Sequence, residues 1–404
     1  MRISALVFAL LGVAIAEPAS AITDKVLYSF PNSSESAPVG QLLWQNGNLF
    51  VPLAGGPGYV FELTESGGVW SGTPVYTFDT NPSPQPAAGL IQNSAGALFG
   101  TTYYGGTYGE NGGTAYVVAN SGGTWTGKLI WNFGGTGDGS LPADPLVVDS
   151  AGNLYGTTET GGANTGGTVF ELSTCPRCHG WSEKILFDFG NPDSDNYFPT
   201  AGLLMDSSGN LFGTTTYGGT DSVGTVFELS PSGSTWTQKV LYNFTGGTDG
   251  GVPYAGLIED ASGNLYGTTS QDGKYGYGTV FEISLCNPKG CKETTLHQFA
   301  DGNDGADPGS SLRFGCTVER NGCLVNYAVL YGTTPYGGTY NEGTAYGLSL
   351  SGSTWTEFFR HSFGSGHDGV TPSGGVVLDG SGNIYGVTYG GGTSNNGIVY
   401  EITP

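Results

Sequence analysis

The sequence predicts an all-β fold: a seven-bladed β-propeller of four-stranded antiparallel blades, with the ring closed by the N-terminal strand. Three observations predict it. A glycine-rich phrase recurs seven times along the 404 residues, each copy holds short strand-like segments, and the set of segments is complete only if the two ends of the chain meet. Recurrence of this kind indicates a solenoid, a propeller or an array.

The phrase is Gly-Asn-Leu-Tyr-Gly-Thr-Thr, then a loop with paired glycines, then Gly-Thr-Val-Phe-Glu-Leu-Ser. It occupies residues 152–158 and 167–173, and its first half returns at 209–215 and 263–269. Weaker copies start near Gly47, Gly96, Val329 and Gly382. We expect the parts that recur in every copy to be scaffold, and the departures from the pattern to be the better candidates for function.

Each copy contains four segments, which are clearest at residues 201–206, 211–216, 225–230 and 235–244. They are rich in β-branched and aromatic residues and are separated by glycine turns, which is typical of antiparallel strands. The fourth segment is apolar on both faces, as expected where one blade stacks on the next.

The number of segments predicts how the ring closes. The first three segments occur seven times, but the fourth follows only six of these sets and ends at Phe78, Phe133, Phe189, Phe244, Phe299 and Phe363. The missing copy stands at the other end of the chain, at residues 25–30, so the N-terminal strand is expected to complete the last blade and leave no open sheet edge. The longest gap, between the fifth and sixth copies, predicts an elaborated hairpin in the sixth blade.

The N-terminal segment predicts export. Arg2 precedes a short apolar run, and residues 19–21 fit the small-x-small cleavage rule, so residues 1–21 are expected to be a signal peptide. The mature chain would start at Ile22 and form one propeller domain over residues 22–404. We expect a secreted protein, extracellular or periplasmic after cleavage near Ala21.

Composition limits the partners. A net charge of −22 argues against nucleic acid and anionic membranes as partners. The aromatic content of 12% argues against disorder, because a disordered chain lacks the residues needed to bury a core. We expect a monomer that does not insert into membranes.

The phrases GNLYGTT…GG…GTVFELS and STWTQKVLYNFTGGTDG resemble those of the bacterial GloVer tandem-repeat proteins, which are exported and often carry a C-terminal anchor. The resemblance covers nearly all of residues 25–404. It implies a propeller-like fold and export, and it implies no particular activity. We expect this chain to lack the anchor.

The six cysteines form three close pairs, Cys175/Cys178, Cys286/Cys291 and Cys316/Cys323. An even number of cysteines in an exported chain favours disulfides. The alternative for the first pair is zinc, because His179 follows it directly, but a structural zinc site needs four ligands and no second half-site is nearby.

One face of the propeller is expected to collect the loops between second and third strands, which are rich in glycine and tyrosine. Aromatic rings beside hydrogen-bonding groups suit sugars, whose ring faces are apolar and whose rims are polar. The alternative is that the rings only pack the loops together. The candidate ligand-binding residues are Tyr104, Glu110, Tyr217, Asp221, Tyr275, Tyr336, Tyr340, Glu342 and Tyr389.

Connections between blades on the same face carry a recurrent Asp-Gly, at Asp138, Asp249, Asp304 and Asp368. Asp301, Asn303 and Asp304 cluster oxygen atoms that could bind calcium, although a turn in which an Asp caps its own backbone explains them more simply. No other cofactor is expected. His367 is the best single acid/base candidate, because imidazole titrates near neutral pH.

Glutamates that recur on the third strands, including Glu62, and tryptophans that recur at the start of the fourth are expected to make blade-to-blade contacts. The leading hypothesis is therefore a secreted, non-catalytic propeller that binds glycans or other extracellular polymers. One alternative is a polysaccharide lyase or glycosidase that uses His367, and another is a protein-interaction scaffold, since propellers serve all three purposes.

Overall fold

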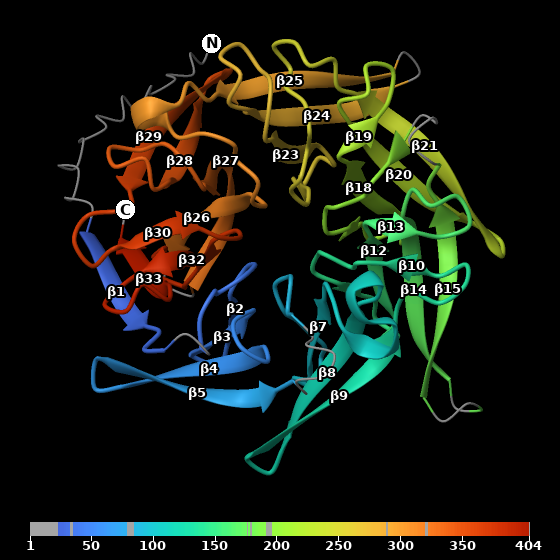
Figure 1. Ribbon diagram of the computed structural model, residues 1–404. Coiled ribbons are helices and arrows are strands. Elements are labelled where there is room, and N and C mark those ends of the chain that lie inside the picture. The colour runs from blue at the N-terminus through green and yellow to red at the C-terminus, as the bar shows by residue number, and fades with distance from the viewer. Residues whose placement is uncertain are drawn as a thin grey trace, which may run out of the picture.

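Six four-stranded sheets and one five-stranded sheet surround a common axis in the computed structural model of the protein (Figure 1). The structure describes residues 23–32, 35–78, 85–175, 177, 180–190, 196–287, 290–319 and 322–403. All seven sheets are antiparallel blades, so the predicted propeller is confirmed. The predicted signal peptide and its cleavage site lie outside the described residues.

The blades follow one another along the chain, and within a blade the strands run outward from the axis in sequence order. Blades 1 and 2 consist of β2 (Leu43–Gln45), β3 (Asn48–Leu53), β4 (Tyr59–Ser66) and β5 (Val69–Thr77), then β6 (Ile91–Gln92), β7 (Leu98–Thr102), β8 (Thr114–Ser121) and β9 (Thr124–Asn132). Blades 3 and 4 consist of β11 (Val147–Val148), β12 (Leu154–Thr158), β14 (Thr168–Cys175) and β15 (Gly180–Asp188), then β17 (Leu204–Met205), β18 (Leu211–Thr215), β20 (Thr225–Ser232) and β21 (Thr235–Asn243). Blades 5 and 6 consist of β22 (Ile258–Glu259), β23 (Leu265–Thr269), β24 (Thr279–Asn287) and β25 (Gly290–Gln298), then β26 (Arg313–Glu319), β27 (Gly322–Thr334), β28 (Thr344–Ser351) and β29 (Thr354–Ser362).

The seventh blade joins the two ends of the chain. It contains β31 (Val377–Leu378), β32 (Ile384–Gly391), β33 (Ile398–Thr403) and the N-terminal strand β1 (Thr23–Ser29). β1 pairs with β33 in antiparallel register from Thr23↔Thr403 to Ser29↔Ile398. Phe30 is fully buried beyond the end of β1, and its N–H donates to the Gly397 carbonyl at 3.1 Å. Closure by the N-terminal strand is confirmed.

The turn between the first and second strands of a blade is built around an aspartate. Asp149 Oδ1 accepts hydrogen bonds from the N–H groups of Ala151 and Asn153, each at 2.8 Å, and Oδ2 accepts one from Asn153 Nδ2 at 2.8 Å. This is the local side-chain bonding that makes Asp a turn residue. The same bonds recur at Asp206, Asp260 and Asp379.

The Gly-Thr-Thr of the repeat has a separate structural reason for each residue. A side chain at Gly332 would overlap the ring of Tyr346 on the next strand, so only glycine fits. The hydroxyl groups of Thr158 and Thr168 join the second and third strands of blade 3 at 2.8 Å. Thr157 donates its hydroxyl to the Ala201 carbonyl of blade 4 at 3.3 Å. The phrase is scaffold.

Aromatic side chains fill the space between blades. The rings of Tyr155 and Trp236 lie 6.5 Å apart between blades 3 and 4, and those of Tyr266 and Trp355 lie 6.4 Å apart between blades 5 and 6. Trp125 Nε1 donates to Glu62 of the preceding blade at 3.3 Å. For these residues the tryptophans and the repeated glutamate make the predicted blade-to-blade contacts.

Blade 6 carries the elaborated hairpin that the sequence predicts, because β27 is 13 residues long and pairs with all of β26. Smaller additions decorate the loops. Two short sheets pair β10 (Gly139–Ser140) with β13 (Thr160–Gly161) and β16 (Asn196–Tyr197) with β19 (Tyr217–Gly218), β30 (Gly369–Pro372) joins β32, and the helices η1 (Gly106–Asn111) and η2 (Gly302–Asp304) are 3-10 turns. In the described part of the chain no helix is long and apolar enough to cross a membrane.

None of the cysteines within the described residues is free, since Cys175, Cys291 and Cys316 are disulfide-bonded. Cys178 lies outside the described residues, as do the side chains of Cys286 and Cys323. The three predicted pairings therefore stay predictions.

Candidate ligand-binding site

Loops between second and third strands, and connections from one blade to the next, emerge on the same face of the ring, which we call the loop face. Ten tyrosines among the described residues are exposed, and nine of them lie on the loop face. They are Tyr104, Tyr108, Tyr217, Tyr254, Tyr275, Tyr277, Tyr336, Tyr340 and Tyr389. The tenth, Tyr327, lies in the hairpin of blade 6.

The predicted ligand-binding tyrosines are exposed, but they are distributed over the ring. Tyr217 stacks on Tyr197, with ring centres 5.6 Å apart and an interplanar angle of 27°. Tyr104 rests edge-on against Tyr103 at 4.7 Å, and Lys274 Nζ lies 4.7 Å from the centre of the Tyr275 ring. The other three are more than half exposed, namely Tyr336, Tyr340 and Tyr389.

The predicted carboxylates are distributed in the same way. Glu110 and Asp221 are exposed on blades 2 and 4, and Glu342 is half-buried on blade 6. The structure therefore does not bring the nine predicted residues together in one pocket. Whether they bind a ligand stays a prediction.

The aspartates of the Asp-Gly connections have partners that the sequence analysis missed. Each partner stands seven residues earlier, near the end of the preceding fourth strand. His297 Nε2 lies 3.1 Å from Asp304 Oδ1, and Tyr242 donates its hydroxyl to Asp249 at 2.9 Å. The pairs with this spacing are Trp131/Asp138, Tyr242/Asp249, His297/Asp304 and His361/Asp368. The constant spacing is a signal that the sequence does contain.

His367 stands apart from this arrangement. Its side chain is exposed and makes no hydrogen bond or ion pair with the described residues. The adjacent Asp368 instead lies 3.1 Å from His361 Nε2. An acid/base role for His367 stays a prediction, and the structure gives it no partner within the described ranges.

The predicted calcium ligands are arranged as a turn. Asp304 Oδ2 accepts the Ala300 N–H at 2.9 Å, while its Oδ1 faces His297. Asp301 begins the 3-10 turn η2, and Asn303 is exposed within it. Calcium binding by these residues stays a prediction.

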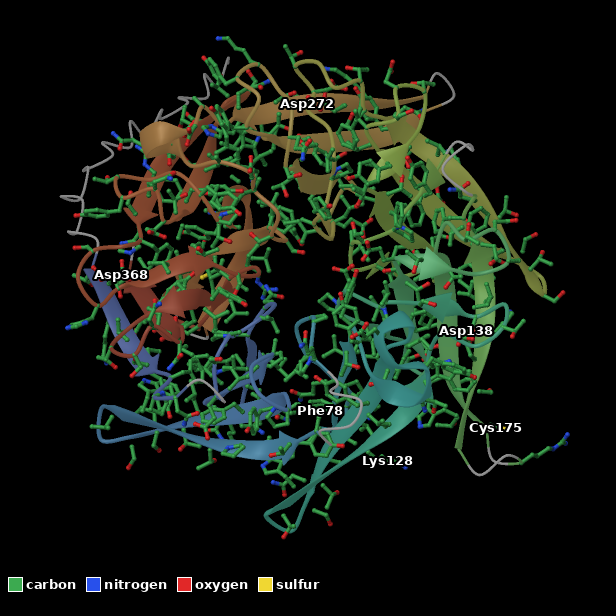
Figure 2. The ribbon with its side chains drawn as sticks, viewed as in Figure 1. Phe78, Lys128, Asp138, Cys175, Asp272 and Asp368 are labelled. Atoms are coloured by element: carbon green, nitrogen blue, oxygen red, sulfur yellow. The ribbon has the colours of Figure 1, made fainter. Side chains whose placement is uncertain are left out.

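A second carboxyl group faces the connection aspartate at four blade junctions. It comes from the fourth strand of the following blade, at the position two residues after the recurrent tryptophan in blades 3 and 6. The facing pairs are Asp138 with Glu183, Asp249 with Glu293, Asp304 with Glu357, and Asp368 with Asp24. Asp138 and Asp368 lie on opposite sides of the ring (Figure 2).

The repulsion between the two carboxyl groups of a pair is relieved differently at different junctions. Arg360 Nη1 lies 3.6 Å from Asp304 and 3.3 Å from Glu357, so a guanidinium holds the third pair together. Burial raises the pKa of Glu293 to about 7. Burial and the neighbouring Asp138 carboxyl raise the pKa of Glu183 to about 9, so that pair holds a proton at neutral pH.

The junction of blades 2 and 3 is also hollow. A groove of about 650 Å³ is lined by Trp131 and Asp138 of the blade 2 side, by Trp181 and Glu183 of β15, and by Tyr108 of η1. Three buried polar atoms here, Trp131 Nε1, Asp138 Oδ1 and Glu183 Oε1, make no hydrogen bond of good geometry with the described residues, although the Asp138 carboxyl interacts with both Trp131 and Glu183. Buried polar atoms normally have a protein or water partner, so this groove can accept the polar groups of a ligand.

A second polar cluster lies on the loop face where the repeat is broken. Tyr103 donates its hydroxyl to Glu159. Asp144, which stands where the next repeats have Ala201 and Ala255, has a buried Oδ2 without a partner among the described residues. Burial, followed by the charge of Glu159, raises the pKa of Asp144 well above its ordinary value. These residues could have been found as departures from the phrase.

The opposite face holds a cavity of about 540 Å³. It is lined by inner strands of blades 4, 5 and 7 and by the blade 6 hairpin, including Ile258, Phe314 and Leu378, with Glu259 and Arg313 as its charged groups. Burial, followed by nearby Asp carboxylates, raises the pKa of Glu259. The cavity depends on where the blade 6 hairpin packs relative to blades 4, 5 and 7, which the sequence did not predict.

Comparison with known proteins gives a family match and a shared fold. The model of the Gloeobacter/Verrucomicrobia repeat matches residues 16–193 and 179–325. No curated protein matches the sequence.

Two solved structures are similar to this chain in fold. An ancestral GH74 enzyme is 12% identical with a TM-score of 0.55, covering 91% of this chain and 48% of that one. A candidate 6-phosphogluconolactonase from Bacteroides uniformis is 12% identical with a TM-score of 0.53, covering 88% of this chain and 89% of that one. Likeness at this identity shows the fold alone.

Proposed function

We propose that this chain, which belongs to the Gloeobacter/Verrucomicrobia repeat family, binds glycans on its loop face without transforming them. The observation that carries the proposal is the groove between blades 2 and 3. Three buried polar atoms without a well-formed hydrogen bond to the described residues line this groove of about 650 Å³ together with aromatic rings.

The lining suits a polyhydroxylated ligand. Tyr108 is 48% exposed and offers a ring at the rim, while Trp131 and Trp181 are partly buried along the groove. Indole and phenol rings match the apolar faces of sugars and supply polar handles at their edges. The raised pKa of Glu183 means that the Asp138–Glu183 pair shares one proton, so the remaining carboxyl oxygens of the pair accept hydrogen bonds from sugar hydroxyl groups.

The volume agrees with a ligand of one or a few sugar units, because small-molecule pockets span roughly 300–1,000 Å³. Exposed rings elsewhere on the loop face, such as Tyr336 and Tyr389, would extend contact along a polymer. We place this activity outside the cytoplasm, in keeping with the predicted signal peptide.

The same groove does not support hydrolysis. Glycosidases keep their two carboxyl groups about 5–5.5 Å apart when they retain configuration and farther apart when they invert it. Asp138 and Glu183 are close enough to share a hydrogen bond, which leaves no room for a sugar carbon or a water between them. Paired carboxyls also recur at three other junctions, so the pair is not a special catalytic arrangement.

Calorimetric titration of the mature protein with oligosaccharides selected on a glycan array tests the proposal. Tyr108→Ala and Trp131→Phe remove a ring and a single donor. We expect each to weaken binding by about tenfold, because a hydrogen bond in such a site contributes about 0.5–1.5 kcal/mol and a lost ring costs at least as much.

Two variants serve as controls. Glu293→Gln changes the equivalent acid of another junction, and Tyr327→Ala removes an exposed tyrosine outside the loop face; both should bind as the parent does. Unchanged affinity in Tyr108→Ala and Trp131→Phe would refute the groove as the site. Shortened products would instead favour the lyase or glycosidase alternative, and capture of a protein partner through this face would favour the scaffold alternative.

A further inference from the structure

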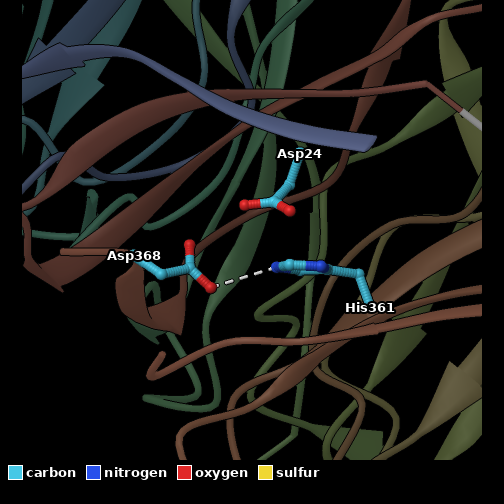
Figure 3. A group of neighbouring side chains, drawn as sticks. All are labelled: Asp24, His361 and Asp368. Atoms are coloured by element: carbon cyan, nitrogen blue, oxygen red, sulfur yellow. Dashed lines mark hydrogen bonds and ion pairs between the residues drawn. The ribbon is translucent and has the colours of Figure 1, made fainter. Parts of the chain in front are cut away.

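The seam where β1 closes the ring holds one imidazole and two carboxylates. Asp24 lies on β1, His361 on β29, and Asp368 in the connection between β29 and β30. One potential ligand atom from each lies within 4.8 Å of those of the other two, and His361 Nε2 lies 3.1 Å from Asp368 Oδ2. Figure 3 shows the two carboxylates and the imidazole turned toward one another.

The seam has the same design as the junction of blades 5 and 6, but it lacks that junction's cation. There, His297, Asp304 and Glu357 occupy the equivalent places, and Arg360 bridges the two carboxylates. The position of Arg360 on the fourth strand corresponds to Leu27 of β1, which is buried and apolar.

The seam therefore has two facing carboxylates whose neutralising residue is missing. Asp368 is buried, whereas Asp24 is exposed and its carboxylate makes no hydrogen bond or ion pair with the described residues. The arrangement is open on one side to solvent and has a nitrogen donor at its base. These two carboxylates and one imidazole would form a complete cation site once a positively charged ion is bound.

We propose that Asp24, His361 and Asp368 bind a first-row divalent cation, with Zn²⁺ as the best match, and that this cation fastens the N-terminal strand to blade 6. Imidazole nitrogen together with carboxylate oxygen suits zinc better than calcium or magnesium, which prefer oxygen alone. Water would complete the coordination on the exposed side, as at zinc sites with three protein ligands.

The geometry is close to what the ion needs. Zinc bonds of about 2.0–2.2 Å place neighbouring ligand atoms about 3–3.5 Å apart. The Asp368–His361 distance of 3.1 Å already meets that spacing. Asp24 has the freedom of an exposed side chain near the start of β1, so its carboxylate can move the remaining distance.

The ion would link three segments that the backbone joins only indirectly. β1 is hydrogen-bonded to β33, whereas His361 belongs to blade 6. Binding in the folded ring and not in the unfolded chain stabilises the ring in proportion to the logarithm of ion concentration. The bound ion would thus stabilise the closed ring, and this role does not depend on glycan binding at the loop face.

Competition with a chromophoric zinc chelator tests this on the mature protein after metal removal and with disulfides intact. We expect one Zn²⁺ per chain. Asp24→Asn and His361→Gln should each weaken binding at least tenfold, and Asp24 is exposed, so its variant should still fold. Zn²⁺ should raise the thermal midpoint of the parent by a few degrees and leave that of Asp24→Asn unchanged.

His297→Gln is the matched control, because His297 faces Asp304 at the same 3.1 Å in a junction that already has its cation. It should bind Zn²⁺ as the parent does. Failure of the parent to bind micromolar Zn²⁺ would overturn the proposal. So would an affinity in Asp24→Asn equal to that of the parent, or an equal loss in His297→Gln.

Discussion

Replacing Phe30 with alanine measures how firmly the N-terminal strand closes the ring. Phe30 is fully buried, and its ring meets those of Tyr28 and Phe61 edge-on at 5.1 and 5.5 Å. Phe61 belongs to blade 1, so Phe30 ties the last blade to the first. Phe244 has the corresponding place at an interior junction, where it is also fully buried and meets Phe281 at 5.0 Å.

The expected loss follows from this burial. Replacing a buried phenylalanine with alanine costs about 3–5 kcal/mol, which combines lost transfer free energy with the cavity left behind. Phe30→Ala and Phe244→Ala should therefore lower the free energy of unfolding by similar amounts within that range. Val26→Ala removes an exposed side chain from the same strand, 37% accessible, and should change it by less than about 1 kcal/mol.

Guanidinium unfolding followed by tryptophan fluorescence supplies the measurement, with the three variants compared at equal protein concentration. A loss of only about 1 kcal/mol in Phe30→Ala, beside a full loss in Phe244→Ala, would refute the reasoning. It would mean that β1 lies against the ring without carrying the packing energy of an interior fourth strand.

Three further predictions concern protonation, turns and cysteines. The pKa of Glu183 is about 9 in the folded protein against an ordinary value of 4.5, so the folded state holds a proton that the unfolded chain releases. The free energy of unfolding should therefore fall as pH rises between about 4.5 and 9. Glu183→Gln should flatten this pH dependence in unfolding curves recorded at pH 5, 7 and 9, and an unchanged slope would contradict the prediction. Asp260→Ala should cost about 1–3 kcal/mol in thermal unfolding because it removes the side-chain bonds to Ser262 and Asn264, whereas the exposed Asp221→Ala should be nearly silent. Peptide mapping without reduction should recover the three short-range disulfides Cys175/Cys178, Cys286/Cys291 and Cys316/Cys323. A peptide that links cysteines of two different pairs would disprove this assignment.

Much of the fold could be predicted because the repeat states each blade separately. The last set of segments lacks a fourth strand, and the only unassigned fourth segment stands at the N-terminus. A closed ring leaves no sheet edge open, so this segment was placed in the last blade, where β1 pairs with β33. The long gap between the fifth and sixth copies predicted the hairpin of blade 6, but not that this hairpin would help to form a cavity with Ile258 and Leu378. That depends on packing between blades, which strand patterns do not encode.

The site was harder to predict for a related reason. Exposed tyrosines such as Tyr336 could be placed on one face from topology alone. The groove could not be predicted in this way, because Asp138 and Glu183 belong to neighbouring repeats and meet only when adjacent blades pack together. The sequence singles out His367, the neighbour of Asp368 along the chain, whereas the structure gives Asp368 a different partner, His361. The seven-residue spacing joins His361 to Asp368 across a turn.

The blade junctions show that charge is not needed to dock one blade on another. At two junctions glycine replaces the second acid, and an aromatic ring of the preceding fourth strand fills the space: a side chain at Gly127 would overlap the Tyr76 ring, and one at Gly72 would meet Tyr28 and Phe61. Such apolar packing avoids the cost of burying a carboxyl group. Four junctions nevertheless keep two carboxyls. The described contacts compensate them by a proton at Glu183 and by Arg360, whereas at the seam only His361 lies beside the two carboxylates. Since the scaffold packs other junctions without charge, we propose that the charged junctions are retained for binding, with a polar ligand between blades 2 and 3 and a cation at the seam.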